Sequence, residues 1–180
     1  MVERYLGHRM LSVGSGLKIG MPIRIDNPRE LGADRLVNAV AAHARFNGAC
    51  ISVDFGTAVT YDCVSETGEY LGGVIAPGVE VSLDALTMRG AKLPKIDLLP
   101  PRTAIGKSTV EAIRSGVIYG YAAQVDGIVG RLVREMDGEP DVIATGGLAG
   151  SIAPYCDAIE EIDDLLTLRG LKLLYERNQG

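Results

Sequence analysis

The sequence contains few of the residues on which several large enzyme classes depend. Only two histidines, His8 and His43, occur among the 180 residues, and neither has a cysteine or a second histidine at metal-ligand spacing. Because protein zinc sites are built largely from Cys and His, a zinc enzyme is not expected. A Ser-His-Asp hydrolase would have to use one of these two histidines, and the Gly-x-Ser-x-Gly turn of many such enzymes is absent.

Cysteine is also scarce. The three cysteines, Cys50, Cys63 and Cys156, are odd in number and far apart in the sequence. Two of them lie in or beside apolar runs that are typical of strands. We therefore predict buried, reduced thiols rather than a disulfide framework or a redox site.

The sequence has no surplus of positive charge and no long apolar run. Lys and Arg number 18 against 23 Asp and Glu, a net charge of −5, which argues against a nucleic-acid binder with a broad basic face. No stretch reaches the roughly 18–20 apolar residues that a membrane-spanning helix needs. The first residues lack an apolar signal core with a small-residue cleavage site, so we expect a cytoplasmic protein that binds neither nucleic acid nor membrane.

The clearest element is a helix that begins after Asn27. This residue can cap the helix, Pro28 suits the first helical position, and Glu30 completes the spacing of a capping box. An apolar stripe then recurs at helical spacing: Ala33, Leu36, Val37, Val40 and Ala44. Asn47-Gly48 is a typical end signal. On this interpretation Asp34 lies inside the helix, where aspartate is a mediocre helix former.

Further elements follow in an order that is typical of an α/β protein. A short helix is also possible over residues 2–11. The predicted strands are Cys50–Phe55, Ala58–Ser65, Tyr70–Ile75, Val142–Ala144 and, at an edge, Ala158–Ile162. The predicted helices are Val79–Met88, Thr109–Met136, Leu148–Tyr155 and Leu165–Arg177. A meander of three strands that passes into crossover units predicts a mixed sheet flanked by helices.

The longest predicted helix has a face of small residues: Ala112, Gly116, Gly120, Ala123 and Gly127. Each glycine inside a helix costs about 0.5–1 kcal/mol relative to alanine, so this face predicts a close approach by another group. Packing within the chain and a twofold subunit interface both remain possible. Alternatively, the helix breaks in two near Gly116–Gly120.

Two glycine turns are candidates for phosphate binding. Asp54-Phe-Gly56-Thr57 ends the first strand, and it combines an acid that can hold a cation with free backbone and hydroxyl donors. Thr145-Gly146-Gly147 lies between a predicted buried strand and a helix start, where N–H groups favour anions. A plain hairpin and a plain strand-to-helix turn are the alternatives. Two such turns in one sheet favour a phosphate site.

A third candidate is the segment Gly32–Arg35. Asp34 could act as a general base for a hydroxyl, and Arg35 could hold a carboxylate or phosphate. An ordinary exposed acid–base pair is the alternative. Farther along, Ser108 or Thr109 caps the long helix. The preceding Gly106-Lys107-Ser108 lacks the upstream glycine of a phosphate-binding P-loop.

Together these segments resemble the type III pantothenate kinases. The matching segments are DNPRELGADRLVNAVAA at 26–42, DFGTAVTYD at 54–62, GGVIAPG at 72–78, GKST at 106–109 and ATGGLAG at 144–150. The resemblance implies an actin-like ATPase (ribonuclease H-like) fold with an incomplete first half-domain. Residues 1–48 would be the remnant of that half-domain with its connecting helix, and residues 49–180 the second half-domain.

The resemblance also implies an activity, which is ATP-dependent phosphorylation of pantothenate to 4'-phosphopantothenate, the first step of coenzyme A biosynthesis. ATP, magnesium and a monovalent cation, potassium or ammonium, would be required, and the enzyme would be a homodimer. Asp34 matches the catalytic base, and Asp54 matches the cation ligand. Pantothenate contacts are implied at Gly32, Ala33, Asp34, Arg35 and Thr109. ATP contacts are expected at Gly56, Thr57, Gly146 and Gly147.

Two departures from the family pattern affect these expectations. No Asp-x-Gly-Asn-Thr loop precedes Asp26, and Ile25 stands where many members carry a tyrosine. We therefore predict very low kinase activity for these 180 residues alone. Two other hypotheses remain open: a non-catalytic regulatory paralogue that binds pantothenate or a protein partner, and a related kinase acting on a different small alcohol.

Overall fold

The structure is a computed structural model that describes residues 5, 7, 10–14, 16–90, 94 and 96–179. The short helix predicted over residues 2–11 therefore lies largely outside the described residues. The remaining elements are η1 (Pro28–Glu30), α2 (Ala33–Phe46), β1 (Cys50–Phe55), β2 (Ala58–Val64), β3 (Tyr70–Pro77), α3 (Val79–Arg89), α4 (Thr109–Glu135), β4 (Asp141–Thr145), α5 (Ala149–Ile152), η2 (Ala153–Tyr155), β5 (Glu161–Ile162) and α6 (Leu166–Arg177).

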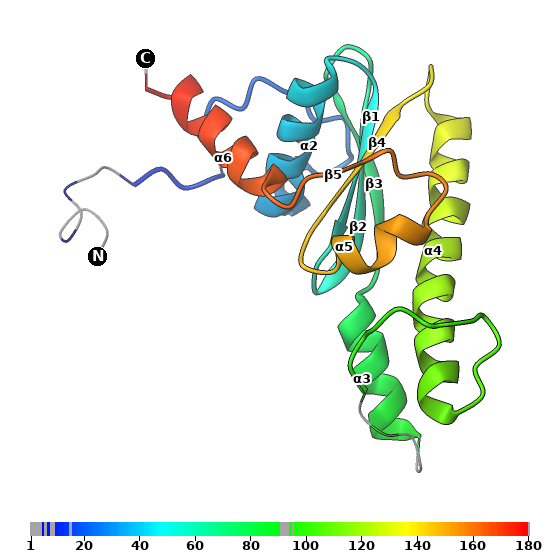
Figure 1. The fold of residues 1–180 in the computed structure, drawn as a ribbon. Coiled ribbons are helices and arrows are strands. Elements are labelled where there is room, and N and C mark those ends of the chain that lie inside the picture. Colours follow the sequence, from blue (N-terminus) through cyan, green and yellow to red (C-terminus); the bar gives the residue numbers. More distant parts are fainter. Residues whose placement is uncertain are drawn as a thin grey trace.

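The five strands form one mixed sheet in the order β3-β2-β1-β4-β5. β1, β2 and β3 pair as an antiparallel meander, whereas β4 pairs in parallel with β1, and β5 pairs in parallel with β4. Figure 1 shows α2 and α6 on one face of this sheet and α4 on the other. The predicted α/β fold with a mixed sheet flanked by helices is confirmed.

Strand alternation divides the core into two layers. Val53 and Phe55 of β1 pack with α4 and α5, whereas Cys50 packs with α2 and α6. Asp54 alternates with Val53 and Phe55, so it lies on the face that α2 covers. The fold thereby places the end of β1 beneath the beginning of α2.

The start of α2 differs from the prediction. Residues 28–30 form a separate 3-10 turn, and α2 begins only at Ala33, with Gly32 as its N-cap. Asn27 does cap the first turn by accepting from the Arg29 N–H at 3.3 Å, but its side-chain amide donates to the Glu30 carboxylate at 2.7 Å. Asp34 is therefore in the first turn of α2, where an acid is favoured by the helix dipole, and the predicted mid-helix position was wrong.

The helix α4 is continuous over 27 residues, so a break near Gly116–Gly120 does not occur. Ser108 caps it, accepting from the Glu111 N–H at 3.2 Å. A Cβ atom added at Gly116, Gly120 or Gly127 would meet nothing within 4 Å. Packing within the chain therefore does not explain the small-residue face, which lies open.

The three cysteines are free, with Cys50 and Cys63 buried in the sheet. Burial raises the pKa of the Cys50 and Cys63 thiols to about 12. The predicted burial is confirmed for these two residues, while Cys156 is only partly buried.

One glycine allows α6 to cross closely over α2. A Cβ added at Gly170 would overlap the carbonyl oxygen of Val37 and lie 2.7 Å from its Cγ1. We expect Gly170→Ala to lower the free energy of unfolding by about 1–3 kcal/mol, as overpacked cores do. Urea denaturation measures this change, with Gly130→Ala in α4 as the control, because a Cβ there would meet only the end of the Arg134 side chain at 3.8 Å. Equal stability of Gly170→Ala and the parent chain would contradict the close crossing.

Candidate active site

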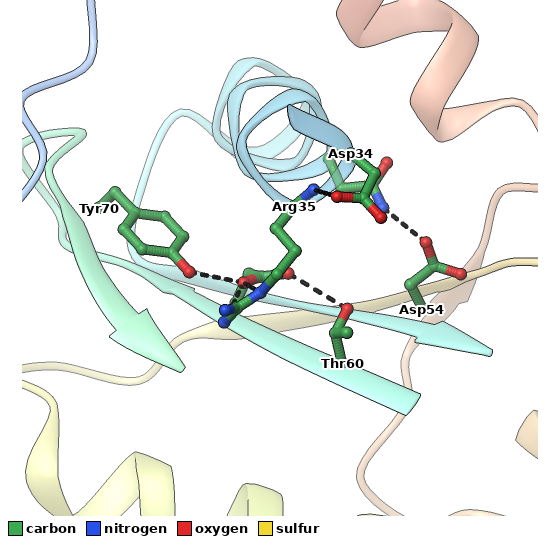
Figure 2. Close-up of polar contacts among 7 residues, drawn as sticks. Asp34, Arg35, Asp54, Thr60 and Tyr70 are labelled. Carbon is green, nitrogen blue, oxygen red and sulfur yellow. Dashed lines mark hydrogen bonds and ion pairs between the residues drawn. The ribbon is translucent and has the colours of Figure 1, made fainter. Parts of the chain in front are cut away.

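The candidate site is a cluster of polar side chains and glycine turns around Asp34 and Asp54. Its first member, Asp34, lies in the first turn of α2. Its side chain is exposed, and its Oδ1 accepts from the Arg35 N–H at 2.9 Å. A Cβ at position 32 would lie 2.6 Å from the same oxygen, so Gly32 provides the space that this carboxylate occupies. Figure 2 shows Asp34 above the sheet, on the same side as Asp54.

Asp54 is held at the end of β1 by a buried partner. Its Oδ2 accepts from the Nδ2 of Asn38, one turn along α2 from Asp34, at 2.9 Å. Burial raises the pKa of Asp54, the Asn38 hydrogen bond lowers it, and the charge of Asp34 raises it further. The two carboxylates are therefore close enough to interact electrostatically.

The second glycine turn meets Asp54 from the neighbouring strand. Gly146 follows β4 with φ +95°, and a Cβ there would overlap the Oδ1 of Asp54 and lie 2.7 Å from the Phe55 nitrogen. Only glycine fits this conformation and this approach. A cavity of about 410 Å³ opens at this point and is lined by Asp54, Thr145, Gly146, Gly147, Gly150, Asp164 and Thr167.

The Arg35 guanidinium is directed toward the sheet. Its Nε and Nη2 both donate to the Oδ1 of Asp62 at 2.8 Å, and the Tyr70 hydroxyl donates to the same carboxylate at 2.7 Å. The Asp62 side chain is 1% exposed. Burial raises its pKa to about 6, and Arg35 and Tyr70 oppose that rise. Figure 2 shows this network beneath the first turn of α2.

The remaining predicted site residues differ in how near they lie to Asp54. Gly56 is beside it, because a Cβ there would be 3.5 Å from the Asp54 Oδ1, and Thr57 is exposed at the next position of the β1–β2 turn, beside the backbone of Gly78. Thr109 is the first residue of α4, in a turn that packs with α3 through Leu83, Ile96 and Ile113. Figure 1 shows this end of α4 beyond the sheet. Among the described residues of a single copy, no hydrogen bond or ion pair links Thr109 to Asp34.

A family model of type III pantothenate kinase matches residues 1–131. The chain belongs to the type III pantothenate kinase family. The "Type III pantothenate kinase" of Moorella thermoacetica is 53% identical over 178 residues, which are 99% of this chain and 70% of that protein. The protein of the same description from Exiguobacterium sp. is 54% identical over 179 residues, again 99% and 70%. Matches of this extent identify the chain as a kinase of pantothenate in coenzyme A biosynthesis.

A solved structure supports the fold. The chain matches a putative Baf family transcriptional activator from Campylobacter jejuni with a TM-score of 0.59 and 22% identity, over 98% of this chain and 88% of that one. At this identity the similarity concerns the fold alone.

In this pantothenate kinase family member, sequence reasoning assigned no role to several residues of the cluster. They are Asn38, Asp62, Tyr70, Asp164 and Thr167. Two of them had a detectable signal, because Asn38 is the one polar residue in the otherwise apolar run 36–42 and Asp62 is a charged residue inside a predicted strand. Polar residues at positions where the pattern expects burial are usually paired. Their partners could not be read from the pattern.

A cation at Asp54 of this kinase would have few side-chain ligands. Among the residues that the structure describes, no three His, Cys, Asp or Glu side chains converge on one position. Hard cations are coordinated by backbone carbonyl, carboxylate and phosphate oxygens. The ligand chemistry around Asp54 and the glycine turn therefore fits a cation that shares its coordination with main-chain and phosphate oxygens.

Proposed function

We propose that Asp34 is the general base that accepts the proton of the pantothenate hydroxyl as phosphate is transferred from ATP. One observation supports this most directly: Asp54 and the Gly146 turn line a cavity where β1 and β4 end, and the charge of Asp34, from a third segment, acts on Asp54. Phosphoryl transfer depends on positioning, charge neutralisation and a base near the acceptor hydroxyl. Exposure of Asp34 leaves its carboxylate accessible to a substrate.

The segment Gly32–Arg35 is the proposed pantothenate contact, as the family resemblance implies. Because the Arg35 guanidinium binds the chain's own Asp62, we propose that Gly32, Ala33 and the Arg35 backbone contribute through the main chain. The same contacts of Arg35 keep the start of α2 fixed against β2. Thr109 stays a predicted substrate contact.

The phosphate groups of ATP are proposed to lie against the two glycine turns. Backbone N–H groups of Thr57, Gly146 and Gly147 would donate to them, as such turns do in anion sites. The Gly56 N–H donates to the Ala58 carbonyl oxygen at 3.1 Å, so Gly56 is proposed to contribute by leaving room for a phosphate rather than as a donor. Asp54 is the proposed ligand of a potassium or ammonium ion. Such a cation supplies positive charge next to the phosphates, and magnesium would accompany ATP.

A homodimer through the open face of α4 is also proposed. Ala112, Gly116, Gly120 and Ala123 are all exposed and small, which allows two helices to approach closely. The half-domain division at residues 48 and 49 stays a proposal. None of the helices in the described part of the chain is long and apolar enough to cross a membrane. A cytoplasmic location is proposed from the biosynthetic role.

A coupled ADP-release assay with pantothenate, ATP and potassium tests the proposed function. We expect pantothenate-dependent ADP release that is very low for this chain and higher after an N-terminal strand with an Asp-x-Gly-Asn-Thr loop is added. Absence of turnover in both forms would contradict catalysis and favour the regulatory paralogue. Faster turnover of another hydroxy acid in a substrate panel would contradict pantothenate as the acceptor.

A further inference from the structure

We propose that Asn38 is a positioning residue that sets the orientation of the Asp54 carboxylate, and that Thr167 in turn sets the orientation of Asn38. This inference rests on the proposed role of Asp54 as a cation ligand. It adds two residues, on α2 and α6, to the groups that determine how the site binds its cation.

The contacts form a chain of three residues from three elements. The Asn38 side chain is fully buried at 0% exposure. Its Nδ2 lies 2.9 Å from the Oδ2 of Asp54, and its Oδ1 lies 2.7 Å from the Thr167 hydroxyl. Both ends of the amide are therefore satisfied inside the protein, which is necessary because an unpaired buried polar group is costly.

The direction of each hydrogen bond follows from the chemistry of the groups. An ionised carboxylate can only accept, so Asn38 must present its NH₂ to Asp54. The amide oxygen then faces Thr167, whose hydroxyl must donate. Loss of the Thr167 hydroxyl would leave the buried amide oxygen without a donor and would remove one of the two contacts that hold the amide in this orientation.

The two oxygens of the Asp54 carboxylate therefore have different partners. Oδ2 accepts from Asn38, whereas Oδ1 is the oxygen next to the Gly146 turn. Thr167 itself lines the same cavity as Asp54 and Gly146. Asn38 thus holds the carboxylate in the rotamer that presents Oδ1 to the cavity. Such outer partners of a ligand are known to control its orientation.

The test measures cation binding without depending on turnover. The melting temperature of the full chain is recorded as KCl replaces NaCl at constant ionic strength, and the midpoint of the potassium-dependent rise is determined. We expect Asn38→Leu and Thr167→Val each to raise this midpoint about 10–100-fold, the range found for outer-shell substitutions at metal sites. Thr167→Ser keeps the hydroxyl and should restore a midpoint close to that of the parent chain.

The outcomes separate positioning from simple structural support. If both variants melt lower without potassium but keep the parent midpoint, Asn38 and Thr167 only stabilise the fold and the inference is wrong. Thr167→Val keeps the amide and serves if Asn38→Leu does not fold. Asp54→Asn is the benchmark: an unchanged midpoint there would overturn the proposed cation role of Asp54, and this inference with it.

Discussion

Replacement of Asp34 by asparagine is expected to lower kcat by roughly 10²–10⁴-fold, the usual contribution of a general base. Asparagine keeps the size of the side chain and its acceptor for the Arg35 N–H, but it cannot take up the hydroxyl proton. The effect should fall on kcat rather than on KM, because the lost interaction matters in the transition state. The ADP-release assay measures it, in whichever form of the chain turns over pantothenate.

The matched control for this substitution is Asp84→Asn on α3. Asp84 is an exposed acid away from the Asp34 cluster, and its substitution removes the same charge. We expect it to leave kcat unchanged. Asp34→Asn should also change the free energy of unfolding by no more than about 1 kcal/mol, the size of an exposed helix-dipole interaction. Substantial turnover in Asp34→Asn would remove Asp34 as the base.

Replacement of Arg35 by methionine is expected to lower the free energy of unfolding by about 3–5 kcal/mol near neutral pH, because it leaves the buried Asp62 carboxylate without its cation. Asp62 is 1% exposed, and both of its Arg35 hydrogen bonds are 2.8 Å long. The double variant Arg35→Met/Asp62→Leu removes the unpaired Asp62 charge as well and should recover most of the lost free energy of unfolding. Urea denaturation of Arg35→Met, Asp62→Leu and the double variant gives the coupling free energy between the two residues.

The loss of stability in Arg35→Met should depend on pH in a defined direction. Burial raises the pKa of Asp62 to about 6, above the value of about 3.9 in unfolded chains. A group with a raised pKa in the folded state stabilises it below the unfolded pKa, and this contribution is lost as pH rises through the folded pKa. Loss of Arg35 removes a group that lowers the pKa of Asp62, so its pKa rises further. The deficit of Arg35→Met should therefore be smaller at pH 5 than at pH 7.5.

Two results would contradict this account of the ion pair. One is an equal deficit at both pH values, which would mean that the Asp62 charge is not responsible. The other is a double variant that is as unstable as Arg35→Met, which would point to lost packing of the arginine stem instead. An exposed pair provides the control, because Arg45→Met breaks a contact with Glu161 in which the arginine is 59% exposed. Exposed pairs contribute about 0–1 kcal/mol, so little loss is expected there.

Local patterns in the sequence predicted most of the elements. The first three strands begin at the predicted residues and end within two of their predicted ends, because alternation and the flanking turns are properties of neighbouring residues. Asn47 ends α2 in the left-handed conformation with φ 55°, and Ser108 caps α4. The start of α2 was missed because the sequence Leu31-Gly32 carries no strong stop signal after the capped turn at Pro28.

For the site, the sequence by itself determined which chemical groups are present: the acids at 34 and 54, the two glycine turns, and the motif order that indicated the family. Only the tertiary structure decided how they are paired. Arg35 meets Asp62 across 27 residues, and Asn38 meets Thr167 across 129. Such pairings leave no periodic pattern in the sequence. They depend on how α2 and α6 lie over the sheet and on which buried polar group is within reach of another.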